Sequence, residues 1–204
     1  MATITFPSNL PVGKIMWALQ RRDLAYTSIF GSQAIEVSSP VWMVTIESST
    51  MTELKGGAWK AFLLQLKGKI NNIALWDMKR PIPLGTMRGA MTLNAQAVSG
   101  ATTLSIIASG EISKTLLAGD LLGLGTGTTQ QVCMVMTDAT SDGYGIISVT
   151  VEPALRNTHN AAAAVTWDKP KALFRQTKSK SGWEYSHGSM VSGFSLDLVE
   201  DWRT

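Results

Sequence analysis

The stretch that most constrains the fold of this chain runs over residues 116–157, where short apolar segments alternate with tight-turn sequences. Apolar runs at 121–124, 131–136 and 146–151 are separated by turns that contain glycine or aspartate, and Pro153 ends the last run. Runs of apolar and β-branched residues bounded by Gly, Asp and Pro are typical of strands joined by hairpins. The stretch therefore predicts a compact β module set within a larger domain.

The segment before this module predicts a strand followed by one amphipathic helix. Residues 41–47 carry apolar side chains on both faces of the expected strand, so we expect one face against the core and the other against a helix or a neighbouring subunit. Residues 50–68 are predicted to be helical, with Thr50 and Glu53 forming a capping box and Gly68 at the C-terminal cap. The apolar face of this helix comprises Trp59, Phe62, Leu63 and Leu66.

Further strands are expected on both sides of the module. Residues 14–20 are predicted to form a strand that ends at the charged Arg21, Arg22 and Asp23, and Gly31 is interpreted as a bend. The remaining strands are expected at 72–78, 91–98, 104–106, 161–167, 172–175 and 190–202.

The order of these elements predicts an α+β fold of mostly antiparallel β structure. We expect a β-sandwich-like domain with one amphipathic helix, made of residues 1–98 and 168–204, and an inserted small β-barrel-like module at 99–167. The 204 residues, of which 45% are hydrophobic and 16% charged, suffice to bury a substantial core.

The charge, the cysteine content and the lengths of the apolar runs argue against a nucleic-acid-binding protein, a disulfide-bonded protein and a membrane protein. The net charge of +3 is only mildly basic, and the densest basic clusters, Arg21–Arg22 and residues 178–180, are short enough to be solvated surface. Cys133 is the only cysteine, so no intrachain disulfide is expected. Its apolar neighbours predict a position in the core. The N-terminus lacks the pattern of a signal peptide, and no apolar run approaches a membrane span, so we expect a soluble chain that is not exported by the usual signal.

The sequence offers little catalytic or metal-binding chemistry. The glycines at 123, 125 and 127 lack the Lys-Ser/Thr ending of a phosphate loop and precede a strand-like run, so they are interpreted as a hairpin turn. Neither His159 nor His187 has a partner at metal-ligand spacing. We therefore expect no cofactor, no metal site and no catalytic residue.

Three aspartates in the module leave an alternative open. Asp120, Asp138 and Asp142 would suit paired-carboxylate hydrolysis of sugars or a calcium-binding turn. Their positions in turns favour capping of backbone donors instead.

Tryptophan and methionine are unusually frequent, with seven and ten residues respectively. Both residue types are enriched at subunit contacts. The candidate interface residues are Trp17, Trp42, Met43, Trp76 and Trp202.

The order of segments over residues 40–176 resembles the distal tail proteins and related baseplate ring proteins of tailed bacteriophages. The first half is similar to their belt domain, in which a strand precedes a helix with an "AFL..L.G" ending. The segments that carry the resemblance are 41–44, 62–68, 73–77, 80–89 ("RP.P.GT.RG"), 117–120, 135–139, Gly145, 152–156 and 172–175. Residues 1–39 and those after Arg175 are not covered by it.

The resemblance implies a structural protein of the phage tail tip or baseplate and no enzymatic activity. It implies a homo-oligomeric ring, commonly of six copies, that joins the tail tube protein to the hub or fibre proteins. DNA would meet such a protein only in transit through the channel, and no membrane contact is implied. The protein would be made in the host cytoplasm and located in the virion.

Two other functions stay open from the sequence. A carbohydrate-binding or adhesion module would stack sugars on Trp183 or Trp167. A wall-degrading hydrolase would need Asp120, Asp138 or Glu152 to face a second carboxylate across a cleft.

Overall fold

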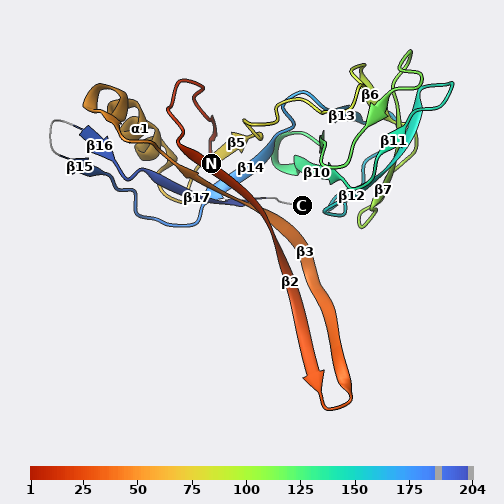
Figure 1. The fold of residues 1–204 in the computed structure, drawn as a ribbon, viewed down its shortest axis with the longest axis horizontal. Coiled ribbons are helices and arrows are strands. Elements are labelled where there is room, and N and C mark those ends of the chain that lie inside the picture. The colour runs from red at the N-terminus through yellow and green to blue at the C-terminus, as the bar shows by residue number, and fades with distance from the viewer. Residues whose placement is uncertain (187–189, 202–204) are drawn as a thin grey trace. The chain divides into compact units, whose positions relative to one another are not determined.

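The computed structural model describes residues 1–186 and 190–201. The chain divides into two compact units, the first made of Met1–Leu75 with Leu173–Asp201 and the second of Trp76–Ala172. Both units consist mainly of β-strands, and the described chain has one α-helix, so the expected α+β fold with mostly antiparallel strands is confirmed (Figure 1). The strand at 91–93 belongs to the second unit, so this unit begins earlier in the chain than the insert expected at 99–167.

The first unit contains a six-stranded sheet. β1 pairs with β5 in parallel, and the pairs β14–β17, β17–β3 and β3–β2 are antiparallel. The strands in spatial order are β1 (Thr3–Thr5), β5 (Asn72–Leu75), β14 (Ala172–Gln176), β17 (Ser195–Glu200), β3 (Gly31–Glu47) and β2 (Lys14–Ser28).

Helix α1 (Glu53–Leu66) belongs to the same unit, as does a small sheet of β15 (Glu184–Ser186), β16 (Met190–Ser192) and β4 (Met51–Thr52). The predicted apolar face is confirmed, since Trp59, Phe62, Leu63 and Leu66 are all buried. The indole of Trp59 stacks on the ring of Phe194 with 5.7 Å between ring centroids. These contacts give the first unit an aromatic core.

The helix begins two residues later than the sequence predicts, and the predicted capping box at Thr50 is wrong. Thr52 is the N-cap residue and makes no side-chain capping hydrogen bond. Met51 and Thr52 are held in extended conformation because they pair with β16. The Glu53 carboxylate instead accepts a hydrogen bond from the Lys60 ammonium group.

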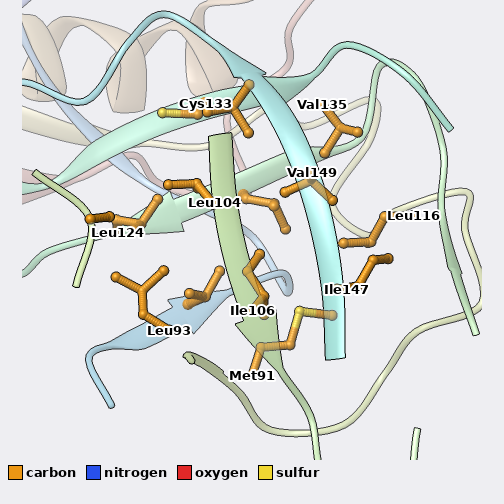
Figure 2. Close-up of a cluster of buried hydrophobic side chains, with 14 of the residues drawn as sticks. Met91, Leu93, Leu104, Ile106, Leu116, Leu124, Cys133, Val135, Ile147 and Val149 are labelled. Carbon is orange, nitrogen blue, oxygen red and sulfur yellow. The ribbon is translucent and has the colours of Figure 1, made fainter. Parts of the chain in front are cut away.

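The second unit is built around a closed six-stranded barrel, which confirms the expected barrel-like module. Apolar side chains from its strands point toward one another inside the barrel, and Leu116 of a neighbouring two-stranded sheet joins the same cluster (Figure 2). The barrel strands in order are β10 (Gln131–Val135), β12 (Ile146–Glu152), β7 (Thr103–Ile107), β6 (Met91–Leu93), β13 (Ala164–Thr166) and β9 (Leu121–Leu124). A two-stranded sheet of β8 (Thr115–Leu116) and β11 (Ala139–Thr140) and the 3-10 helix η1 (Gly127–Thr129) complete the unit.

The strands β2 and β3 form one long hairpin, and here the sequence-based prediction is wrong. Pairing continues from Lys14 opposite Glu47 to Ser28 opposite Gly31, straight through the charged residues that were expected to end the first strand. Register shifts near Arg22 absorb extra residues of β3 without ending the pairing. The hairpin extends well beyond the sheet to which its base belongs (Figure 1).

Candidate interaction surface

Residues 21–39 of the β2–β3 hairpin are exposed along their whole length, and we call this segment the arm. The base of the same hairpin differs, because Trp42, Val44 and Ile46 are buried in the sheet. A two-stranded ribbon with neither face covered is only marginally stable in water. The arm therefore has the features of an element that another surface covers.

One side of the arm is apolar. Leu24 lies opposite Ile35, and Tyr26 lies opposite Gln33, so these four side chains share one face. Leu24, Tyr26 and Ile35 are between 60% and 70% exposed. Burying a side chain of this size contributes about 1.5–3 kcal/mol, so covering this apolar face would stabilise a complex substantially.

The other side of the arm carries small side chains and two acidic ones. Ala25 lies opposite Ala34 and Thr27 opposite Ser32, while Asp23 and Glu36 form a directly opposed pair of carboxylates. Like charges in direct cross-strand positions destabilise a hairpin. Neither Asp23 nor Glu36 has a hydrogen-bond or ion-pair partner within the described residues. No ion pair within the described residues therefore offsets this repulsion, although Arg21 and Arg22 precede Asp23.

The tip of the arm ends in two apolar side chains. Ile29 and Phe30 are each 93% exposed. The Ser28 hydroxyl accepts a hydrogen bond from the backbone N–H of Phe30 at 3.2 Å and donates one to the carbonyl of Gly31 at 3.3 Å. The side-chain bonds of Ser28 shape the turn and leave both apolar side chains in solvent.

The sequence-predicted interface residues have different environments. Trp42 is only 6% exposed, and it therefore belongs to the core of the first unit. Trp17, Met43 and Trp76 are half-buried and stay candidate contact residues. Trp17 packs edge-on against Trp42 at 6.0 Å, and the Lys171 ammonium lies 5.4 Å from the Trp76 ring centroid. Trp202 lies outside the described residues.

The two tryptophans considered for sugar stacking already have cationic partners. The Lys60 ammonium lies 5.4 Å from the Trp183 ring centroid, and the Arg88 guanidinium lies 5.4 Å from that of Trp167. The Trp167 indole N–H also donates to the Gly89 carbonyl at 2.9 Å.

The Lys60 ammonium also donates a hydrogen bond to the Tyr185 hydroxyl at 2.8 Å. This hydrogen bond lowers the pKa of Tyr185, whereas the hydrogen bonds that Lys60 makes with Glu53 and Tyr185 raise the pKa of Lys60. Lys60 therefore joins the helix to the strand segment that carries Trp183 and Tyr185.

The three aspartates of the module all accept hydrogen bonds from backbone N–H groups. Asp120 is buried and accepts from Leu84, Gly85 and Leu117 at 2.7, 3.0 and 2.8 Å. Asp142 accepts from the N–H groups of Tyr144 and Ile146, and Asp138 from that of Ala118. These contacts account for the aspartates as turn and loop supports.

The remaining sequence candidates also lie in structural positions. Cys133 is fully buried in the barrel core, and the glycine-rich segment joins β9 to β10 through η1. His159 is nearly buried, and burial lowers its pKa. His187 lies outside the described residues. No group of three or more His, Cys, Asp or Glu within the described parts of the chain is placed to hold a metal ion.

Sequence reasoning missed the arm, although a signal was present. Leu24 and Tyr26 alternate with small or polar residues, as do Ile35 and Val37, and Gly31 lies near the midpoint. The pattern is that of a hairpin. Its charged residues were instead interpreted as the end of a strand.

No protein-family model and no curated protein matches the chain. None of the helices in the described part of the chain is long and apolar enough to cross a membrane.

Proposed function

We propose that this protein is a structural component of a bacteriophage tail tip or baseplate, which assembles into a homo-oligomeric ring. The ring joins the tail tube to the hub or fibre apparatus, and the resemblance implies six copies. Its partners are further copies of itself, the tail tube protein and the hub or fibre proteins. DNA passes through its channel without being a stable ligand, and the chain has no catalytic role.

The observation that carries this proposal is the exposed arm. An apolar face, an acidic face and an apolar tip extend from a well-packed sheet, and none of the three is covered within the described chain. Exposed apolar surface of this kind, on an ordered element, is typical of protein contacts. A ring of identical subunits supplies the same covering surface to every arm.

A carbohydrate-binding role receives less support. Cationic side chains lie over the rings of Trp167 and Trp183, which the sugar-stacking hypothesis requires to be free. No observation in the structure favours this second function.

The proposal is tested by the mass of the protein in solution and by its binding to a tail tube protein. Wild-type protein is expected to form a closed ring, measured by native mass spectrometry, and to co-sediment with assembled tail tubes. In an arm-less variant, residues 21–40 are replaced by Asn-Gly, which joins the paired residues Gln20 and Val41 through a two-residue turn. This variant is expected to keep a cooperative thermal unfolding transition and to stay monomeric.

The outcome that contradicts the proposal is a wild-type monomer at high concentration that does not bind tail tubes. Electron microscopy of tail particles carrying a labelled copy gives an independent check. The label is expected at the junction between tube and tip, and a label elsewhere on the particle would exclude the assigned position.

A further inference from the structure

The outward face of α1 is an unpartnered surface of the first unit. Leu54 is 91% exposed and Leu64 is 62% exposed, and the exposed Ala58 and Ala61 lie between them. Their spacing of three to four residues places these four side chains on one side of the helix. The exposed Gln65 lies on the same side and the exposed Lys55 borders it, so the face carries mostly small and apolar side chains and suits a partner with small side chains.

Two basic segments that are far apart in sequence meet at the C-terminal end of α1. A Cβ atom built on Gly68 would lie 3.3 Å from the Cα of Ser179, so the turn at 67–69 lies against residues 178–180. Lys178 pairs with Asp197 at 2.6 Å. Lys67, Lys69 and Lys180 are exposed and have no ion-pair partner within the described residues. We call these four lysines the basic patch.

The acidic face of the arm has the complementary properties. It carries two unpaired carboxylates, Asp23 and Glu36, followed toward the tip by the small residues Ala25, Ala34, Thr27 and Ser32. Arg21 and Arg22 precede Asp23 in the arm, but no ion pair to Asp23 or Glu36 forms within the described residues, and the arm runs away from α1 (Figure 1).

We propose that the acidic face of the arm docks on the outward face of α1 and on the basic patch of a second copy of this chain. This inference rests on the proposed function, since it names the surface that receives the arm in the self-assembled ring. The carboxylates of Asp23 and Glu36 meet Lys67 and Lys69, and the small side chains of the arm lie over Ala58 and Ala61. The apolar face of the arm then points away from α1 and is free for another contact in the particle.

The dimensions of the two surfaces agree. Helix α1 has 14 residues and is therefore about 21 Å long at 1.5 Å per residue. The arm from Asp23 to Ile29 spans six residue steps, or about 20 Å at 3.3 Å per residue. With the carboxylates at the C-terminal end of α1, the apolar tip lies beside the exposed Leu54.

One unfavourable term opposes this orientation, because carboxylates near a helix C-terminus meet the negative end of the helix dipole. That effect is modest at an exposed site and is screened by salt. The three unpaired lysines offset it, since they give the patch a net excess of positive charge over the two incoming carboxylates.

A charge-swap experiment on the full chain tests the docking. One variant reverses the arm (D23K/E36K), and a second reverses the patch (K67E/K69E). All four positions are exposed, so folding should be unchanged by circular dichroism. The matched control K79E/K114E makes the same charge change as the patch variant, at exposed positions in the second unit.

Each reversal alone is expected to weaken self-association about tenfold or more in analytical ultracentrifugation, because like charges then face each other. An equimolar mixture of the two variants is expected to restore assembly as an alternating complex. The control should assemble like wild type. The charge-neutralising variants D23N/E36Q and K67Q/K69Q should also weaken self-association, but by less than the charge reversals.

Other outcomes separate the two proposals. If wild type assembles and the arm reversal impairs assembly, but the patch reversal does not, the docking on α1 is overturned and the ring proposal stands. If the wild-type protein itself stays monomeric, both the ring proposal and the docking proposal fail. If the patch reversal removes binding to a duplex DNA fragment and leaves self-association unchanged, the patch is a polyanion site and the docking is overturned.

Discussion

At the residue scale, the buried carboxylate of Asp120 shows how a turn residue stabilises the barrel unit. Asp120 accepts hydrogen bonds from three backbone N–H groups in two separate segments. Its carboxylate therefore ties the proline-rich loop at residues 80–85 to the turn before β9. The segment 117–120, which is one of those that carry the resemblance, thus has a structural explanation in this chain.

Replacing Asp120 with alanine is expected to destabilise the barrel unit by about 3 kcal/mol, because one buried and two partly buried backbone N–H groups lose their acceptor. Urea unfolding followed by fluorescence measures the change. The control is Asp138→Ala, which removes an acceptor from only one exposed N–H group and should cost under about 1 kcal/mol. Equal effects of the two substitutions would contradict this role of Asp120.

His159 should make the barrel sensitive to acid. Burial lowers the pKa of its imidazole below the usual value of 6.5, so the unfolded chain binds the proton more readily than the folded chain. The contribution of neutral His159 to stability is present above pH 6.5 and is lost as the pH falls through the lowered pKa.

We expect the variant His159→Gln to show a weaker loss of stability between pH 7 and pH 5 than wild type. Urea midpoints at both pH values test this. The backbone pairing of His159 with Ala97 does not depend on the side chain, so the variant should still fold. An unchanged pH dependence would remove His159 as the cause.

At the element scale, the β2–β3 hairpin separates two functions along one pair of strands. Its base contributes Trp42, Val44 and Ile46 to the core, and its distal half is exposed. The base therefore decides whether the first unit folds. The proposed function assigns assembly to the distal half.

The double substitution I29S/F30S at the tip tests this division. Both side chains are 93% exposed, so the free energy of unfolding should change by no more than about 0.5 kcal/mol. Self-association should nevertheless weaken, because the apolar tip is lost. Thermal unfolding and native mass spectrometry measure the two quantities, and assembly at the wild-type level would argue against a role for the tip.

At the scale of the whole molecule, the barrel has the features of an independent folding unit. Its apolar cluster draws all of its members from residues 87–167, and its six strands close on themselves. A closed barrel has no free sheet edge that requires a partner.

We therefore expect a fragment of residues 76–172 to fold without the rest of the chain. Its two-dimensional NMR spectrum should show dispersed amide signals, and its urea unfolding should be a single cooperative transition. A fragment of residues 99–167, which lacks β6, should give a collapsed spectrum because the barrel cannot close.

The sequence by itself determined the elements whose pattern is local. The apolar face of α1, the strand β9 at Leu121–Leu124 and the turn before it follow from the spacing of residues such as Trp59, Phe62, Gly119 and Asp120. One buried face or one tight turn leaves a periodic signature within a short window.

The tertiary structure alone decided the features that depend on distant pairing. The N-cap at Thr52 follows from pairing with β16, and the barrel begins at β6 because Met91 pairs with Val165. The basic patch exists because Gly68 lies against Ser179. The arm has the alternating pattern of a hairpin, but the charged residues at its start conceal how far the pairing extends. Its continuation through Arg22 and Asp23 is fixed by the partner strand.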